Sequence, residues 1–279
     1  MNNQYNRIWT RIKQIASQKD FNENARPIFY PGNDSALLIV PGFDDTPFMM
    51  QELSEYLGRY GFTVFTTCLP GRGLSLKELS KTDWQDWVAS LNQDIGLLKE
   101  VCSRLIIIGF STGATTALYS ALQKNKQLRP HGLALISPAL AFHPSFVPLS
   151  IQFGLMKLLQ FLSPFPKNLD NRHLIFMDPV PRIKFHLMEH SSVRTVCELF
   201  KLAARVRQSL SKISCPLYIG QSRNDIVVSP KGAFRIIRSV SSSEIVFQYF
   251  KMSGHPVMVD IQKEDLYQGI LKFIQMIIR

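Results

Sequence analysis

A short turn of small residues between an apolar segment and a helix-like segment constrains this sequence most. Residues 109–113 read Gly-Phe-Ser-Thr-Gly, follow the apolar run 105–108 and lead into the helix-like segment 114–118. Small residues two before and two after a serine let a strand and the next helix approach closely, and the turn presents the hydroxyl above the sheet. Small-residue turns match Gly-x-Ser-x-Gly by chance, so the flanking segments are what favour Ser111 as a nucleophile over an ordinary tight turn.

A nucleophilic serine needs a histidine to take its proton and an acid to orient that histidine. In a strand-turn-helix site of this kind the chain order is serine, acid, histidine. Asp225 follows the apolar segment 216–220, and His255 follows the apolar segment 244–250. Each is weak evidence alone, because Asn-Asp commonly forms a turn and a histidine after glycine is commonly a solvated loop residue. Their joint order predicts a triad with Ser111.

Other acids and histidines fit this order less well. Asp260 competes with Asp225, but it lies only a few residues beyond His255, where we expect the last helix to begin. The remaining histidines precede a strand or lie in the irregular middle of the chain: His131, His143, His173, His186 and His190.

Acyl transfer also needs N–H donors for the oxyanion, each worth on the order of 3 kcal/mol. The apolar segment 36–40 ends in a Pro-Gly-Phe turn, and we assign one donor to the backbone of Phe43 and the other to Thr112, directly after the nucleophile. A purely structural Pro-Gly turn is the alternative. Because carboxylates are unusual beside a developing negative charge, we expect Asp44 and Asp45 to point to solvent.

Several further segments carry a family resemblance. Residues 69–75, Leu-Pro-Gly-Arg-Gly-Leu-Ser, precede the Asp-Trp-Gln-Asp-Trp segment 83–87, and segments 210–230 and 253–273 surround the candidate acid and histidine. With these, the chain resembles the α/β-hydrolase superfamily, and more narrowly its bacterial carboxylesterases and monoacylglycerol lipases. The resemblance implies a serine triad, and catalysis by such a triad needs no metal and no organic cofactor.

The resemblance covers roughly residues 35–140 and 205–279, with three departures. Pro41 stands where many members have a histidine, which removes a polar side chain but keeps the backbone donor. Thr112 is polar and β-branched where the family often has a larger apolar residue. Arg72 replaces the histidine of a Gly-His-Gly segment, so any local hydrogen bonds of that histidine are in question.

The order of apolar segments predicts one α/β domain, an α/β-hydrolase fold with a mostly parallel central sheet, helices on both faces and an inserted helical cap. With 279 residues and 46% apolar residues the chain can fill such a core, and two independent domains fit less well. Strands are predicted at about 36–40, 62–67, 104–109, 132–137, 216–220 and 244–249, and helices at about 47–59, 83–100, 112–124, 230–239 and 262–278. The predicted core comprises residues 1–140 and 209–279, and the cap residues 141–208.

An apolar helix is predicted within the cap, at about residues 151–162. It either packs on the core or covers an acyl channel. Because a cap above the nucleophile forms part of the pocket wall, its apolar side chains favour acyl chains over sugars or charged metabolites.

Charge and cysteine content bear on partners and location. The net charge is +11, but the basic residues are spread along the chain, so we expect no nucleic-acid partner. A basic surface beside an apolar cap would suit peripheral contact with anionic lipid, and a merely basic protein is the alternative. The four cysteines lack metal spacing and are predicted to be buried free thiols. The N-terminus lacks a signal-peptide pattern, and prolines divide the uncharged segment 131–156, so we expect a cytoplasmic protein without a membrane-spanning helix.

Together these features predict a serine hydrolase that cleaves small-molecule esters of apolar acyl chains. An acyltransferase or a thioesterase would use the same triad. A catalytically silent lipid-binding scaffold is a further alternative, as is a lipid-surface protein, which would bind anionic vesicles equally well with Ser111→Ala.

Overall fold

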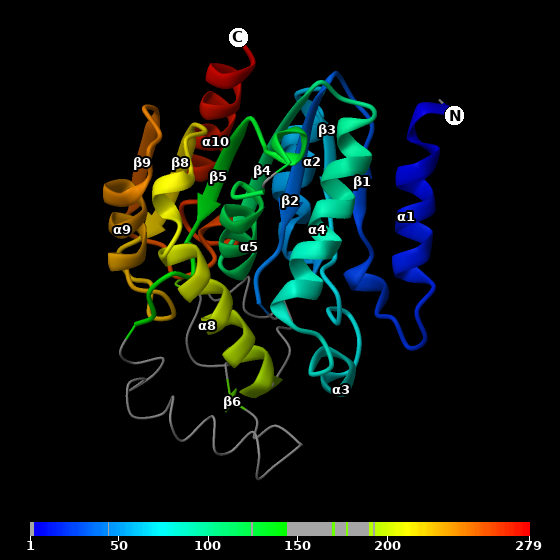
Figure 1. The fold of residues 1–279 in the computed structure, drawn as a ribbon, viewed down its shortest axis with the longest axis horizontal. Helices are drawn as coiled ribbons and strands as arrows, with labels where there is room; N and C mark the ends of the chain where they lie inside the picture. The colour runs from blue at the N-terminus through cyan, green and yellow to red at the C-terminus, as the bar shows by residue number, and fades with distance from the viewer. Residues whose placement is uncertain are drawn as a thin grey trace.

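A seven-stranded, mostly parallel sheet forms the centre of the protein (Figure 1). The computed structural model describes residues 3–43, 45–123, 125–143, 169–170, 177, 190–191 and 193–279. The strands follow the order β1-β3-β2-β4-β5-β8-β9 across the sheet, and only β1 is antiparallel to its neighbour. Their bounds are β1 Ile28–Tyr30, β2 Ser35–Val40, β3 Thr63–Thr66, β4 Arg104–Phe110, β5 Gly132–Ile136, β8 Leu217–Ser222 and β9 Ile245–Phe250.

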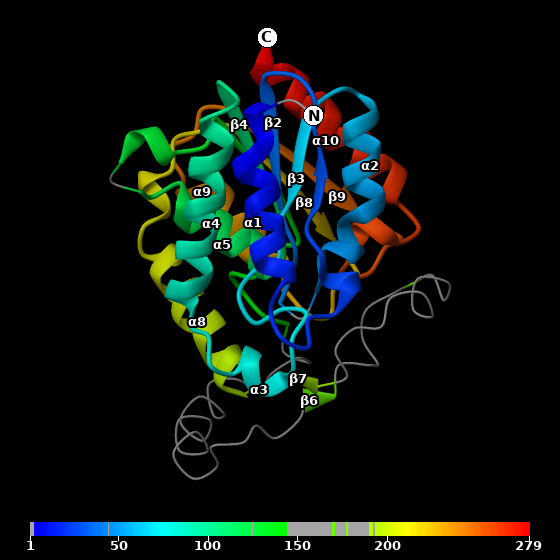
Figure 2. The same cartoon turned by 90° about the vertical axis from the view of Figure 1, so that its right-hand side faces the viewer.

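Helices cover both faces of this sheet, because the strands bury apolar side chains on both sides. In β4, Leu105 and Ile107 pack into one layer of the core, while Ile106 and Ile108 pack into the other. The first layer is covered by α1, α4, α5, α8 and α9, and the second by α2 and α10 (Figure 2). The helices are α1 Asn6–Ala16, α2 Gln51–Arg59, α3 Leu76–Leu79, α4 Trp84–Lys99, α5 Thr112–Ser120, α8 Val193–Arg207, α9 Lys231–Ser239 and α10 Lys263–Ile278.

The predicted fold class is confirmed. Each of the six predicted strands is present, with ends within two residues of the prediction. The predicted helix 83–100 is α4, which begins at a capping box in which the side chains of Asp83 and Asp86 each accept the other residue's backbone N–H at 3.0 Å. The capping residues and the apolar pattern therefore indicate the same start for this helix.

The N-terminal helix α1 was not predicted. Its residues Ile8, Ile12 and Ile15 are buried and share one face of the helix. Arg11 lies beside this face with its side chain only 11% exposed, and its Nε donates to Asp94 Oδ1 of α4 at 2.9 Å. The segment is thus fixed to the core by both apolar and ionic contacts.

Much of the predicted cap falls outside the described residues, including the apolar helix at 151–162. Within the predicted range 141–208, β6 (Leu169–Asp170) pairs antiparallel with β7 (His190–Ser191), and α8 packs against α5. The cap boundaries remain a prediction.

The cysteines and the apolar helices bear on two further predictions. Cys68 and Cys102 are buried free thiols as predicted and Cys197 is also buried, while Cys215 is only half-buried. No helix in the part of the chain that the structure describes is both long enough and apolar enough to cross a bilayer.

Candidate active site

Ser111 lies on a sharp turn between β4 and α5. Its backbone has φ of +52°, in the left-handed region that a residue with a side chain adopts only under strain. The turn is held by the Ser111 N–H, which donates to the carbonyl of Ile136 at 2.9 Å. Helix and strand approach closely here: a Cβ added at Gly113 would lie 2.2 Å from the carbonyl oxygen of Val40 in β2, and one added at Gly109 would lie 2.6 Å from the backbone of the helix. The glycines at both positions are therefore required for this turn.

The structure brings Ser111, His255 and Asp225 into one hydrogen-bonded series. His255 Nε2 lies 3.1 Å from Ser111 Oγ, and His255 Nδ1 lies 2.7 Å from Asp225 Oδ2. Because a carboxylate only accepts hydrogen bonds, Nδ1–H donates to Asp225, and the Nε2 lone pair then accepts the serine hydroxyl. All three residues are at most 5% exposed. This arrangement can move a proton from the hydroxyl to the imidazole.

The Asp225 carboxylate is fixed by neighbours on its own loop and at the end of β8, the strand before that loop. Its Oδ1 accepts the backbone N–H groups of Val227 at 2.9 Å and Val228 at 2.8 Å. Its Oδ2 accepts Nε2 of Gln221 at 3.2 Å in addition to the imidazole. These contacts hold the carboxylate in place and aim one oxygen at His255.

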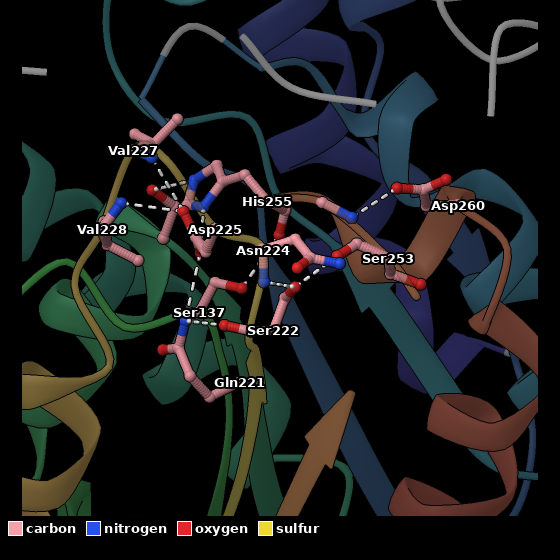
Figure 3. Close-up of polar contacts among 12 residues, drawn as sticks. Ser137, Gln221, Ser222, Asn224, Asp225, Val227, Val228, Ser253, His255 and Asp260 are labelled. Atoms are coloured by element: carbon pink, nitrogen blue, oxygen red, sulfur yellow. Dashed lines mark hydrogen bonds and ion pairs between the residues drawn. The ribbon is translucent and has the colours of Figure 1, made fainter. Parts of the chain in front are cut away.

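The loop that carries His255 is tied to the ends of β5 and β8 (Figure 3). Ser137 Oγ donates to the carbonyl oxygen of His255 at 2.9 Å, and Ser222 Oγ donates to the carbonyl oxygen of Ser253. Sequence reasoning did not find Ser137 or Ser222. The available signal was their place at the carboxyl ends of parallel strands, where functional side chains of open α/β sheets gather.

Asp260, the competing acid, has a place in the same loop. Its Oδ2 accepts the backbone N–H of Gly254 at 2.6 Å and that of Met177 at 3.0 Å. It thereby joins the segment next to His255 to a residue from the middle of the chain, while the imidazole bonds to Asp225. Asp225 thus occupies the position expected of the acid.

The two predicted oxyanion donors lie on neighbouring elements. Phe43 follows β2, Thr112 is the first residue of α5, and β2 pairs with β4 in the register Val40 opposite Gly109. A first helical residue has no partner for its N–H within its own helix. The oxyanion roles of Phe43 and Thr112 remain predictions.

The expectation that Asp45 points to solvent is wrong. Its side chain folds back over Gly42, where a Cβ would lie 2.2 Å from Asp45 Oδ2, and the residue is only 7% exposed. Burial raises the pKa of Asp45 to about 6, while His255, a hydrogen bond from the Gly42 backbone and the charge of Arg72 act in the opposite direction. Asp44 lies outside the described residues.

Arg72, which replaces the family histidine, makes hydrogen bonds of its own. Its Nε donates to the carbonyl oxygen of Phe43 at 2.9 Å, and its Nη1 donates to that of Pro70 at 3.2 Å. The guanidinium lies 4.4 Å from the ring centroid of buried Trp87 in α4, a cation–π contact that fixes its orientation. Arg72 therefore links α4 to the turn that follows β2.

In the part of the chain that the structure describes, no group of three or more His, Cys, Asp or Glu side chains is suited to hold a metal ion. The triad geometry itself requires no metal for proton transfer.

Known proteins resemble this chain over most of its length. A family model described as serine aminopeptidase, S33, matches residues 32–262. A thermostable monoacylglycerol lipase of Bacillus sp. (strain H-257) is 28% identical over 251 residues, which cover 89% of this chain and 94% of the lipase. A carboxylesterase of Bacillus subtilis (strain 168) is 22% identical, with 90% and 96% covered.

Solved structures share the fold. A metagenome-derived lipolytic enzyme superposes with a TM-score of 0.77 at 25% identity, covering 92% of this chain and 99% of that enzyme. The monoacylglycerol lipase of Paleococcus ferrophilus gives a TM-score of 0.76 at 21% identity, with 90% and 98% covered. The likeness to both structures extends over nearly the whole of each chain.

Proposed function

The chain belongs to the serine aminopeptidase S33 family of α/β-hydrolases, and from that premise we propose that it cleaves carboxylic esters of apolar acyl chains through an acyl-enzyme intermediate. At the coarser level it is a serine hydrolase of the lipase and esterase type. The observation that carries the proposal is the series Ser111–His255–Asp225, joined at 3.1 and 2.7 Å.

In the first half-reaction, His255 Nε2 takes the proton of Ser111 as Oγ attacks the ester carbonyl carbon. The carbonyl electron pair moves onto oxygen, where the N–H groups of Phe43 and Thr112 stabilise the negative charge. Asp225 holds the imidazole in the productive tautomer and stabilises the imidazolium. Collapse of the tetrahedral intermediate breaks the ester C–O bond, and His255 returns the proton to the leaving alcohol.

In the second half-reaction, water replaces the alcohol. His255 takes a proton from water, and the resulting hydroxide attacks the acyl carbon bound to Ser111 Oγ. The second tetrahedral intermediate uses the same oxyanion donors. Its collapse releases the carboxylic acid and returns the proton to the serine.

Two observations support apolar acyl groups as substrates. The named relatives include a monoacylglycerol lipase and a carboxylesterase, both aligned over nearly their full length. The sequence of residues 151–162 is strongly apolar and belongs to the predicted cap. An apolar pocket wall binds acyl chains by removing their surface from water.

Hydrolysis of a p-nitrophenyl ester series from acetate to palmitate tests the proposal. Wild type is compared with Ser111→Ala. The matched control is Ser241→Ala, which removes an exposed hydroxyl that donates to the carbonyl oxygen of Ser211. Loss of the nucleophile lowers kcat by about six orders of magnitude, to the background of the assay. Equal rates in wild type and Ser111→Ala would refute the proposed mechanism.

The alternatives give other outcomes in the same experiment. The family description includes aminopeptidases, so aminoacyl p-nitroanilides form a second substrate arm, and acyl-CoA thioesters a third. Turnover that needs an added alcohol would indicate an acyltransferase. A folded protein without turnover that binds anionic vesicles equally well with Ser111→Ala would be a lipid-surface protein instead.

A further inference from the structure

The turn that carries Phe43 is held on both sides by charged side chains that the mechanism above does not use. The N–H of Phe43 belongs to the peptide between Gly42 and Phe43, so the orientation of that one peptide decides whether the donor faces the oxyanion. The peptide before it contains the N–H of Gly42, and the peptide after it contains the carbonyl of Phe43. Both of these flanking groups are hydrogen-bonded.

On the preceding side, the buried Asp45 carboxylate accepts the N–H of Gly42. The fit is close: Oδ2 occupies the space above Gly42 where any side chain would begin, and the ring of Phe110 bounds the same space. The Phe110 ring in turn packs on His255, with centroids 4.8 Å apart. The Phe110 ring is therefore next to both Gly42 and the triad histidine.

On the following side, Arg72 Nε donates to the carbonyl oxygen of Phe43. The guanidinium is itself held against Trp87 and is only 2% exposed. An arginine held in this way keeps a directional hydrogen bond with little freedom to rotate. The pinned carbonyl limits rotation of the peptide that carries the Phe43 N–H.

Charge balance is consistent with this arrangement. A lone carboxylate beside an oxyanion would oppose the reaction by like-charge repulsion. The charged and titratable groups that act on Asp45 are Arg72 and His255, both of which favour its ionised form. His255 becomes positive in the same step in which the oxyanion forms. The positive charges of His255 and Arg72 therefore balance the negative charges of the oxyanion and Asp45.

We infer that Asp45 and Arg72 are positioning residues that hold the Gly42–Phe43 peptide with its N–H aimed at the oxyanion. This inference rests on the proposed function, because it assigns roles around the same nucleophile. It explains together two features of this chain, the acidic residue in the turn and the arginine in place of the family histidine.

The test separates the acceptor role of Asp45 from its charge. Asp45→Ala removes the acceptor for the Gly42 N–H, whereas Asp45→Asn keeps an acceptor oxygen and removes only the charge. Loss of a complete oxyanion donor costs about 100-fold to 1000-fold in kcat, so a misdirected donor is expected to cost about tenfold to 100-fold. We therefore expect Asp45→Ala and Arg72→Met to lower kcat for p-nitrophenyl butyrate by that factor with KM within threefold. The kcat of Asp45→Asn is expected to stay within threefold of wild type. The kcat of Arg72→Lys is expected to lie between those of wild type and Arg72→Met.

Binding of a trifluoromethyl ketone provides the second readout, because its tetrahedral adduct places an oxyanion in the same position. Its inhibition constant should weaken in Asp45→Ala and Arg72→Met by the same factor as kcat. The matched control is Asp94→Ala, which removes another buried carboxylate that contacts an arginine, far along α4. It is expected to lower Tm without changing kcat or inhibitor affinity.

Two results would overturn the inference. One is a folded Asp45→Ala protein with wild-type kcat and inhibitor affinity. The other is an Asp45→Asn protein as impaired as Asp45→Ala, which would assign the effect to charge rather than to positioning. Failure of the proposed function is recognised separately, because wild type would then show no turnover that depends on Ser111.

Discussion

Replacement of Asp45 by asparagine should make the protein more stable at neutral pH. Asparagine has nearly the shape of a protonated aspartate and keeps an acceptor for the Gly42 N–H. The pKa of Asp45 rises from an ordinary value of 3.8 to about 6, chiefly through burial. Since a tenfold change in proton affinity corresponds to about 1.4 kcal/mol, ionising this buried group costs the folded state about 3 kcal/mol relative to the unfolded chain.

The sign of the pH dependence follows from the raised pKa. The folded state binds the proton more tightly, so the contribution of Asp45 to stability is present in full below pH 3.8 and is lost as pH rises through about 6. The difference in free energy of unfolding between Asp45→Asn and wild type should therefore be well under 1 kcal/mol at pH 4. It should grow to about 3 kcal/mol in favour of the variant by pH 8.

Urea unfolding followed by tryptophan fluorescence at pH 4, 6 and 8 measures this difference. The contributions of all ionisable groups that the two proteins share cancel when their free energies of unfolding are subtracted. Asp34→Asn provides a control of opposite sign. Hydrogen bonds from Ser103 lower the pKa of Asp34. Loss of this carboxylate should therefore destabilise the protein at pH 8, and the destabilisation should become smaller as pH falls. A difference for Asp45→Asn that is constant with pH, or that favours wild type at pH 8, would refute the reasoning.

Three other substitutions have defined outcomes. Gly113→Ala forces a methyl group to within 2.2 Å of a β2 carbonyl oxygen, so it should cost at least about 3 kcal/mol, seen as a much lower Tm or no folded protein. Ser137→Ala removes the hydrogen bond to the His255 carbonyl and should lower kcat about tenfold with Tm nearly unchanged; unchanged kcat would show that the loop holds the histidine without it. Arg11→Met leaves the buried Asp94 carboxylate without its nearest cation and should cost roughly 3 kcal/mol of stability while kcat is retained, and its combination with Asp94→Asn should restore part of that loss.

The sequence predicted the elements around the site better than the contacts within it. The order of Ser111, Asp225 and His255 along the chain could be deduced because each follows an apolar strand, and strand ends in a parallel sheet meet at one edge. Ser137 also follows such a strand, but it acts through a backbone carbonyl, for which no residue type is diagnostic. The unpredicted helix α1 has an apolar period too, at Ile8, Ile12 and Ile15, but polar residues dominate the rest of the segment.

The error at Asp45 has a physical cause. Residue type predicts solvent exposure for an aspartate in a turn, since burial of a charge is costly. The compensation comes from His255, from the Gly42 amide and from Arg72, and the positions of His255 and Arg72 relative to the turn depend on the path of distant parts of the chain. Such a compensation involves tertiary structure, and a single sequence contains no local signal for it.

The place of β9 at the edge of the sheet has a consequence for how activity is lost. β9 leads directly into the loop that carries His255, and it is paired on one side only, with β8. Val246 and Tyr249 of this strand remain more than a third exposed, while Phe250 at its end is buried. Edge strands with few buried contacts open at lower free energy than the centre of a sheet. Under mild denaturant, detachment of this strand would carry the histidine away from a serine that stays in place on β4, so esterase activity should fall before the tryptophans in α1 and α4 report any unfolding.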